Sequence, residues 1–188
     1  MRINESTLVA APAETIWNYL ADPENYLHFM SGITHWEVAG DHANGLGARY
    51  RILLRVGAAE VGGLVEMVEW NEPFDIAWHS VTGVDNRGRF RIREQRPGRT
   101  RIEYRLAYGV IGGGVAGLLT EIAAIYPVRQ QMRRTLRQLK RQVEHEQRRL
   151  EAERRRGTRQ GISDARASAG IRDRSLGGGD AGDRHAER

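Results

Sequence analysis

The segment that most constrains the fold is a short strand that turns directly into a helix near the start of the chain. Residues 3–9 show the alternation of a β-strand. Pro12 presets the backbone for a first helical turn, and Glu14 stands where a helix dipole favours an anion. The helix ends near Asp22, because the residue before a proline is pushed out of the helical region. After it come strand patterns and then one long helix, an order that few small folds share.

Strand patterns fill the middle of the chain and are separated by turn residues. The alternating stretches span residues 34–38, 48–56, 61–70, 74–82, 89–94 and 100–108. Turns are indicated at Asn44-Gly45, Asn71-Glu72-Pro73, Asp85-Asn86 and Pro97-Gly98. In the last two stretches apolar residues share one face and arginines share the other. Antiparallel hairpins with one buried face account for this pattern.

A final helix is indicated by apolar residues at spacings of three and four. These are Leu118, Ile122, Ile125, Met132, Leu136, Leu139 and Val143. Such a stripe lies on an apolar surface, so we expect the helix to pack as far as about residue 143. We therefore expect a domain over residues 1–145, a basic helical extension over 146–156, and a disordered tail over 157–188. The tail is rich in Gly, Arg, Asp and Ser and has few apolar residues to bury.

Charge and composition restrict the class of protein. The chain has no cysteine, which excludes disulfides, thiolate catalysis and zinc–thiolate sites. Residues 1–128 hold 12 arginines against 15 acidic residues, whereas residues 129–150 hold 8 basic residues against 2 glutamates. The basicity therefore belongs to the last helix. No signal peptide or membrane span is recognisable, and we expect a cytoplasmic protein.

Four short motifs, in this order and spacing, resemble the START-like (SRPBCC) superfamily and its polyketide cyclase/dehydrase-type proteins. They are Ala11-Pro12-Ala13-Glu14-Thr15-Ile16-Trp17 with Asp22-Pro23, Val68-Glu69-Trp70-Asn71-Glu72-Pro73, Gly98-Arg99-Thr100-Arg101-Ile102, and Leu139-Lys140-Arg141-Gln142-Val143-Glu144. The resemblance covers about residues 1–145. It implies an α+β helix-grip fold, in which a curved antiparallel sheet wraps around a long C-terminal helix, with two short helices after the first strand. It also implies a cavity between sheet and helix for an apolar or aromatic molecule.

Alternation selects the side chains that face such a cavity. The candidate ligand-binding residues are Tyr50, Met67, Trp78, Phe90, Ile92, Tyr104, Leu106, Tyr108, Ile122, Tyr126 and Met132. Many are aromatic or methionine, and apolar walls with a few polar tips describe a ligand pocket. They describe a filled core equally well.

Three polar residues on these stripes are candidates for catalysis. Glu94 is in phase with Phe90 and faces either the cavity or an arginine at the strand end. Tyr104 is central in its strand, so its hydroxyl needs a partner. Arg129 lies on the helical stripe, unless Pro127 kinks the helix so that Val128 takes the inward position.

The histidines show no metal-ligand spacing, and no phosphate-binding glycine motif or dinucleotide fingerprint is present, so neither a metal nor a cofactor is expected.

Three functions remain open. The protein binds a polyketide-, lipid- or quinone-like molecule, or it is an aromatase/cyclase or dehydratase acting by acid–base chemistry. Alternatively, the basic helix from Arg129 to Arg156 docks on nucleic acid or anionic membrane.

Overall fold

The structure, a computed structural model, describes residues 2–56, 59–109 and 115–176; the side chains of residues 56, 59, 115–126 and 161–176 are outside the described part. The chain divides into two compact units, Met1–Gln147 and Arg148–Arg188. The first unit holds all the strands that the structure describes, and the cavity described below lies within it.

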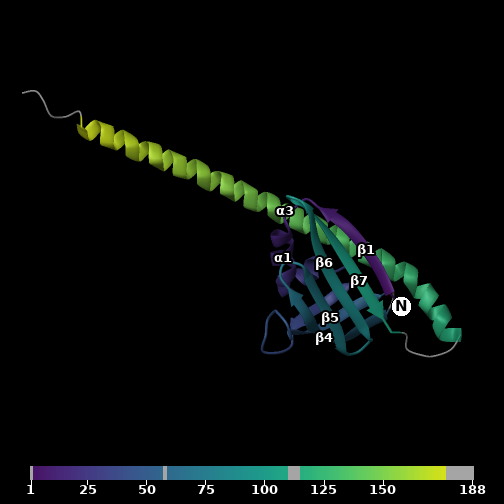
Figure 1. The fold of residues 1–188 in the computed structure, drawn as a ribbon. Coiled ribbons are helices and arrows are strands. Elements are labelled where there is room, and N and C mark those ends of the chain that lie inside the picture. Colours follow the sequence, from purple (N-terminus) through teal and green to yellow (C-terminus); the bar gives the residue numbers. More distant parts are fainter. Residues whose placement is uncertain (1, 57–58, 110–114, 177–188) are drawn as a thin grey trace, which may run out of the picture. The chain divides into compact units, whose positions relative to one another are not determined.

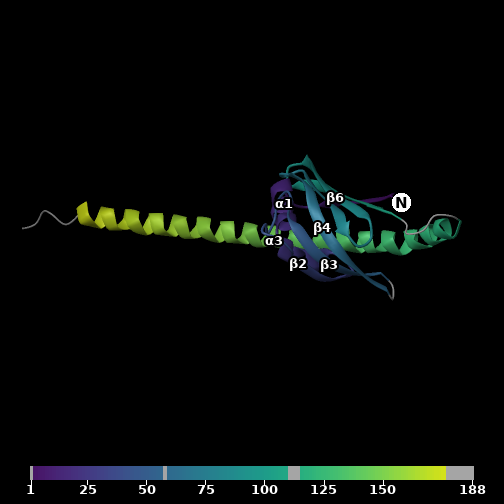
Figure 2. The same ribbon diagram turned by 90° about the horizontal axis from the view of Figure 1, so that it is seen from below.

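Seven strands form one antiparallel sheet in the order β1-β7-β6-β5-β4-β3-β2 (Figure 1). The strands are β1 (Arg2–Val9), β2 (Ile33–Val38), β3 (Arg49–Val56), β4 (Ala59–Asn71), β5 (Asp75–Thr82), β6 (Asn86–Arg96) and β7 (Arg99–Tyr108). From β2 to β7 each strand pairs with the next in the chain, and β1 pairs with β7. Figure 2 shows β2 and β3 side by side at one edge. The meander of hairpins predicted from the alternating stretches is confirmed.

Short helices follow β1, as the Pro12 and Pro23 signals predict. They are α1 (Ala13–Ala21), a 3₁₀ turn η1 (Pro23–Asn25) and α2 (Tyr26–Phe29). Ile16, Trp17 and Leu20 bury the inner face of α1. In α2, the Phe29 ring lies 6.0 Å from the ring of Phe90 on β6. These helices therefore fill one end of the curved sheet.

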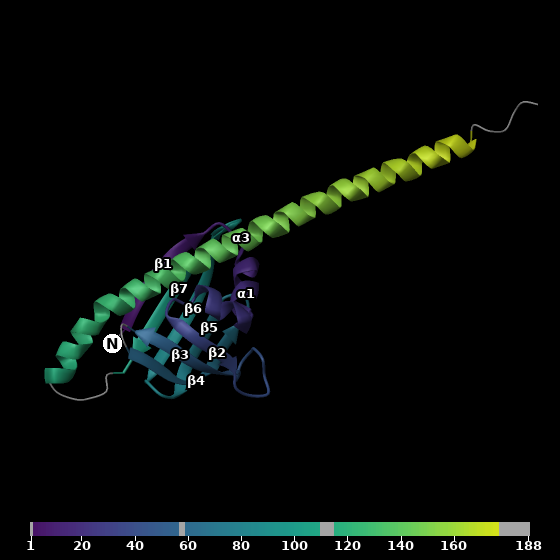
Figure 3. The same ribbon diagram turned by 180° about the vertical axis from the view of Figure 1, so that it is seen from behind.

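The long helix α3 (Val115–Leu176) crosses the concave face of the sheet within the first unit (Figure 3). Met132, Leu136, Leu139 and Val143 are buried there, as their spacing predicts. Polar contacts also join the helix to the N-terminal segment. Lys140 Nζ donates to the Leu8 carbonyl at 2.6 Å, and Glu144 Oε1 accepts from the Ala10 amide at 2.9 Å. The helix-grip fold expected from the sequence is confirmed.

The second unit is described from Arg148 to Leu176 as helix. Composition predicts disorder over residues 157–188, whereas α3 continues as helix through Leu176. Extending an existing helix needs no new nucleus, which is the costly step in helix formation. Residues 177–188 lie outside the described residues. Among the described residues, no helix is long and apolar enough to cross a membrane.

Candidate functional site

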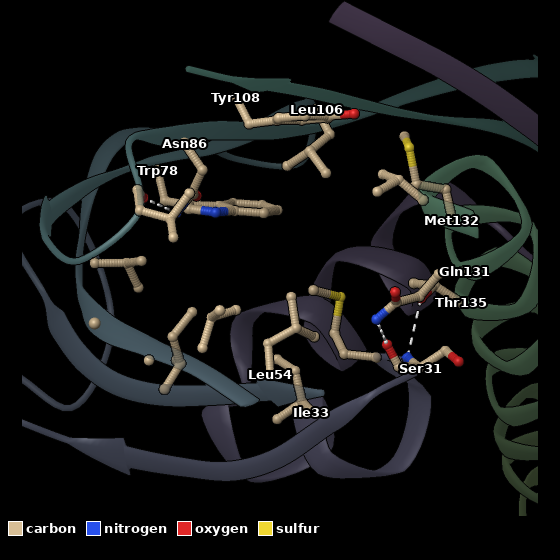
Figure 4. A pocket seen from close by; sticks show the side chains of 18 of the residues that line it. Ser31, Ile33, Leu54, Trp78, Asn86, Leu106, Tyr108, Gln131, Met132 and Thr135 are labelled. Carbon is tan, nitrogen blue, oxygen red and sulfur yellow. Dashed lines mark hydrogen bonds between the residues drawn. The ribbon is translucent and has the colours of Figure 1, made fainter. Parts of the chain in front are cut away.

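A cavity of about 490 Å³ lies between the concave face of the sheet and α3 (Figure 4). Its described walls come from β2 through β7, from the Met30–Ser31 segment after α2, and from one face of α3. In Figure 4 the side chains of Trp78, Leu106 and Met132 surround the hollow from three sides. The cavity is thus built where the sheet curves away from the helix.

The backbone of two neighbouring glycines on β4 forms part of one cavity wall. Gly62 and Gly63 line the cavity. A Cβ on Gly63 would lie 2.3 Å from the Thr82 carbonyl oxygen, and one on Gly62 would lie 2.5 Å from Leu53 Cδ2. The adjoining part of β4 also carries two register shifts in its pairing with β5. Gly63 pairs with the lining residue Ile52, whereas Gly62 pairs with Leu53, which does not line the cavity. The missing side chain at residue 63 and the local bend that bulges produce therefore leave the space open.

Trp78 forms a flat wall because the residue opposite it is a glycine. Trp78 on β5 pairs in register with Gly88 on β6. A Cβ on Gly88 would lie between 2.0 and 2.6 Å from three atoms of the indole, so the ring rests directly on the glycine backbone. The same indole lies 6.2 Å, centroid to centroid, from the ring of Tyr104. The position of this wall depends on the absence of a side chain at residue 88.

A small polar cluster closes the cavity where α3 meets the segment after α2. Thr135 Oγ1 accepts a hydrogen bond from the Ser31 amide at 3.0 Å, and Gln131 Nε2 donates to the Ser31 carbonyl at 2.6 Å (Figure 4). Gly32 follows with φ +88°, and a Cβ there would lie 2.2 Å from Gln131 Nε2. That Cβ would also lie 2.9 Å from the Arg55 carbonyl oxygen, so the positive φ and this backbone contact favour glycine at residue 32.

The Tyr104 hydroxyl lies in the cavity wall and has no hydrogen-bond partner among the described residues. The residue is 4% exposed and lines the cavity. Within the described part of the chain, its hydroxyl makes no hydrogen bond. Burial raises the pKa of Tyr104, so the phenol stays neutral and can donate at physiological pH. Its oxygen is not among the fully buried polar atoms that lack a partner, so it is reached from the cavity and can donate to an acceptor atom on a guest.

The described lining carries no Arg, Lys, His, Asp or Glu side chain. Its ionisable groups are the phenols of Tyr104 and Tyr108. No group of three or more His, Asp or Glu side chains that could hold a metal ion occurs among the described residues. Over this described part, the chemistry of the cavity is that of apolar contact and neutral hydrogen bonds.

The residues that alternation selects fall into two groups: some line the cavity, and others are packed in the core. Five candidates line the cavity: Trp78, Tyr104, Leu106, Tyr108 and Met132. Four others are buried and do not line it: Tyr50, Met67, Phe90 and Ile92. These four point to the concave side, as predicted, but part of that side is packed by α1 and α2; Phe90 contacts Phe29, for example. The side chains of Ile122 and Tyr126 are outside the described residues.

Two of the three catalytic candidates lie away from the cavity. Glu94 is exposed, and its Oε1 accepts from the Gly98 amide at 3.1 Å, so it braces the β6–β7 turn and makes no ion pair with an arginine among the described residues. Arg129 is half exposed, and its Nε lies 3.0 Å from Glu5 Oε1 on β1. Val128 lines the cavity in its place, which is the alternative that Pro127 suggested. Tyr104 alone of the three lies in the cavity wall.

Several residues that line the cavity were not predicted from the sequence. Trp36 and Ile33 come from a strand whose inward face was not assigned, and Ser31 comes from a turn. Gln131 and Thr135 are four residues apart beside Met132, so their spacing on the apolar stripe was a usable signal. Apart from their place inside a strand pattern, nothing in the sequence predicts that Gly62 and Gly63 line a cavity.

A known family profile matches most of the chain. The sequence profile described as polyketide cyclase/dehydrase and lipid transport matches residues 1–144. No curated protein sequence matches the chain.

Solved structures share the fold at low sequence identity. The Thermus thermophilus protein TTHA0849 has 19% identity and a TM-score of 0.65, over 76% of this chain and 97% of that one. The Zhui aromatase/cyclase from a Streptomyces species has 21% identity and a TM-score of 0.63, over 77% and 93%. A START superfamily protein from Mycobacterium smegmatis has 17% identity and a TM-score of 0.63, over 77% and 97%. Because the family profile spans the sheet, the cavity and the part of α3 that packs on the sheet, the chain belongs to the polyketide cyclase/dehydrase and lipid transport family.

Proposed function

We propose that this protein binds an uncharged, largely apolar small molecule in the cavity between the sheet and α3. The observation that carries the proposal is the lining itself. It is mostly aliphatic and aromatic, it has no charged side chain in the described part, and it holds a neutral donor at Tyr104. A volume of about 490 Å³ lies within the usual range for small-molecule sites.

Electrostatics favours a neutral guest over an anionic one. A carboxylate in this cavity would lose its hydration and meet no cation among the described lining residues. An unpaired buried charge costs several kcal/mol, whereas a carbonyl oxygen can accept from the Tyr104 hydroxyl. The proposed guest therefore has an apolar ring or chain system with a carbonyl, ether or hydroxyl oxygen, which polyketide-, lipid- and quinone-like molecules all offer.

Binding is better supported than catalysis. Cyclisation or dehydration of a poly-β-ketone needs a base to remove a proton and an acid to return one. Tyr104 can act as an acid, but a side chain with the pKa of a useful base is absent from the described lining. Glu94 and Arg129 lie outside the cavity. Aromatase/cyclase activity remains a prediction from the family resemblance.

Identification of the natural guest is the direct experiment. Protein purified from its own host is examined by native mass spectrometry, and the small molecules released on denaturation are identified. Val128→Trp places a large side chain in the cavity, and the matched control Val81→Trp changes a residue that is 44% exposed on β5. We expect a neutral apolar molecule to co-purify with the wild type and the control, but not with Val128→Trp. Recovery of the same molecule from all three proteins would contradict the proposal.

A further inference from the structure

The arginines of the first 128 residues are concentrated on two neighbouring strands. Eight of the twelve arginines in residues 1–128 lie within β6 and β7. The same two strands carry only two acidic residues, Glu94 and Glu103. Because residues 1–128 as a whole are acidic, this local excess of positive charge is a specific feature of the sheet.

Alternation directs these arginines to the convex face, on the opposite side from the cavity. Gly88, Phe90 and Ile92 of β6 are buried on the concave side, and Ile102 and Tyr104 of β7 are buried with them. The residues between them form what we call the arginine face: Arg87, Arg89, Arg91, Arg93, Arg99, Arg101 and Arg105. Figure 3 shows α3 crossing the concave side, so no helix of the described first unit covers the arginine face over β6 and β7.

The register places like charges directly opposite each other. Arg89 pairs with Arg105, and Arg93 pairs with Arg101. Directly opposed like charges destabilise an antiparallel pair. Acidic residues offset three of these four arginines, because Asp75 pairs with Arg89 and Arg93 and Glu103 pairs with Arg105. Arg101 has no acidic partner among the described residues, so the face keeps a net positive charge.

Acidic residues fix part of this face in position. Asp75, with 5% side-chain exposure, accepts from Arg89 Nε at 3.2 Å, Arg91 Nε at 3.0 Å and Arg93 Nη2 at 2.9 Å. Arg89 also pairs with Glu69. Both Nη groups of Arg91 make no hydrogen bond to the described residues and remain as donors. Guanidinium groups held in this way are pre-organised, which lowers the entropy lost when an anion binds.

Other arginines of the face have no acidic partner. Arg87, Arg99 and Arg101 are exposed, and among the described residues none of them makes an ion pair. The face therefore combines fixed and free guanidinium groups, with a net positive charge.

We propose that the arginine face binds the phosphate backbone of a double-stranded nucleic acid. Guanidinium groups match phosphate oxygens in bidentate geometry. A duplex carries one negative charge about every 1.7 Å of its axis, so several of its phosphates can contact one cluster of arginines. Single strands need a platform of several aromatic rings for their bases, whereas one exposed ring, Phe74, lies against the arginines of this face, its centroid 5.7 Å from Arg93 Cζ. The contact is with the backbone, so it is independent of base sequence.

The test uses the full-length protein and a fluorescein-labelled 20-base-pair DNA duplex, with binding followed by fluorescence anisotropy between 50 and 200 mM salt. The test variant is R87Q/R99Q/R101Q, which removes three exposed arginines without an acidic partner. The matched control is R134Q/R137Q/R141Q, which removes three exposed arginines from α3. Circular dichroism and thermal unfolding establish that both variants are folded.

We expect the test variant to bind at least tenfold more weakly at 50 mM salt. The slope of log K against log salt becomes shallower by about three, since each lost phosphate contact removes about 0.9. The control variant stays within twofold of the wild type. The proposal is overturned if the wild type does not bind the duplex, if the α3 variant loses as much affinity, or if polyglutamate or phosphatidylserine vesicles bind the face as tightly as the duplex.

Discussion

Replacing Gly88 by alanine tests whether Trp78 is a wall of the binding cavity. The added Cβ would lie 2.0 Å from Trp78 Cζ2, and ordinary contact begins at 3.4 Å, so the indole must retreat by about 1.4 Å. Because the ring rests on the strand backbone, the direction open to it is into the cavity, which it also lines. The substitution therefore reduces the space for a guest without adding a side chain to the cavity itself.

The expected effect on stability is moderate. Overpacking of this kind costs about 1–3 kcal/mol, while replacement of a glycine stabilises by about 0.4–1 kcal/mol through the unfolded chain. We expect a net loss of about 1–2 kcal/mol, or a decrease in Tm of about 2–8 °C for a unit of this size. The guest also loses affinity, because the indole moves into the space that the guest would occupy.

The assay is isothermal titration with 2-acetylnaphthalene, a neutral bicyclic ketone, alongside thermal unfolding. We expect Gly88→Ala to bind the ketone at least fivefold more weakly than the wild type. Gly40→Ala is the control, because a Cβ at residue 40 meets its nearest atom at 4.0 Å and the backbone there is not left-handed. Unchanged ketone affinity in Gly88→Ala would refute the assignment of Trp78 as a cavity wall.

Three further substitutions test other parts of the account. Tyr104→Phe should weaken 2-acetylnaphthalene binding about three- to tenfold in titrations, yet change the free energy of unfolding by less than about 0.5 kcal/mol, because the hydroxyl has no partner among the described residues; a large stability loss with unchanged affinity would contradict this. Gly32→Ala should destabilise by more than about 1 kcal/mol in urea unfolding, because φ is +88° and Gln131 Nε2 is 2.2 Å away; an unchanged midpoint would contradict the close contact. Asp75→Asn should destabilise by about 1–3 kcal/mol at pH 7. Burial alone would raise the pKa of Asp75, but hydrogen bonds from Arg93 and Arg91 and the charge of Arg89 hold it below its usual value. The stabilisation is therefore complete above the unfolded pKa of about 3.9 and is lost as pH falls through the lower folded pKa. Urea unfolding from pH 2 to 7 should show the two proteins converging only at the acid end; a constant difference would contradict it.

The fold could be predicted because its signals are local. Pro12 and Pro23 bound the first helix, and strict alternation in β6 and β7 marks both their faces. The stripe through Met132, Leu139 and Val143 marks the face of α3 that packs on the sheet. Each of these patterns depends on residues a few positions apart.

The cavity could be predicted only in part, because its boundary depends on contacts between distant residues. Alternation puts Phe90 and Tyr104 on the same concave side, but it does not show that Phe29 covers the first of them. Glu94 was in phase with the inward residues, yet the turn amide of Gly98 captures its carboxylate. The arginines of β6 were visible in the sequence, whereas their convergence on Asp75 depends on the β5–β6 register.

The most direct test of the central claim compares two guests that share one ring system and differ in charge. The protein is titrated calorimetrically at pH 7 with 2-acetylnaphthalene and with 2-naphthoate, using the Val128→Trp variant as the occluded control. We predict one-to-one binding of the ketone and at least tenfold weaker binding of the carboxylate, equivalent to about 1.4 kcal/mol or more, with neither bound by Val128→Trp. Equal or tighter binding of the carboxylate, or ketone binding that Val128→Trp leaves intact, would contradict a neutral guest in this cavity.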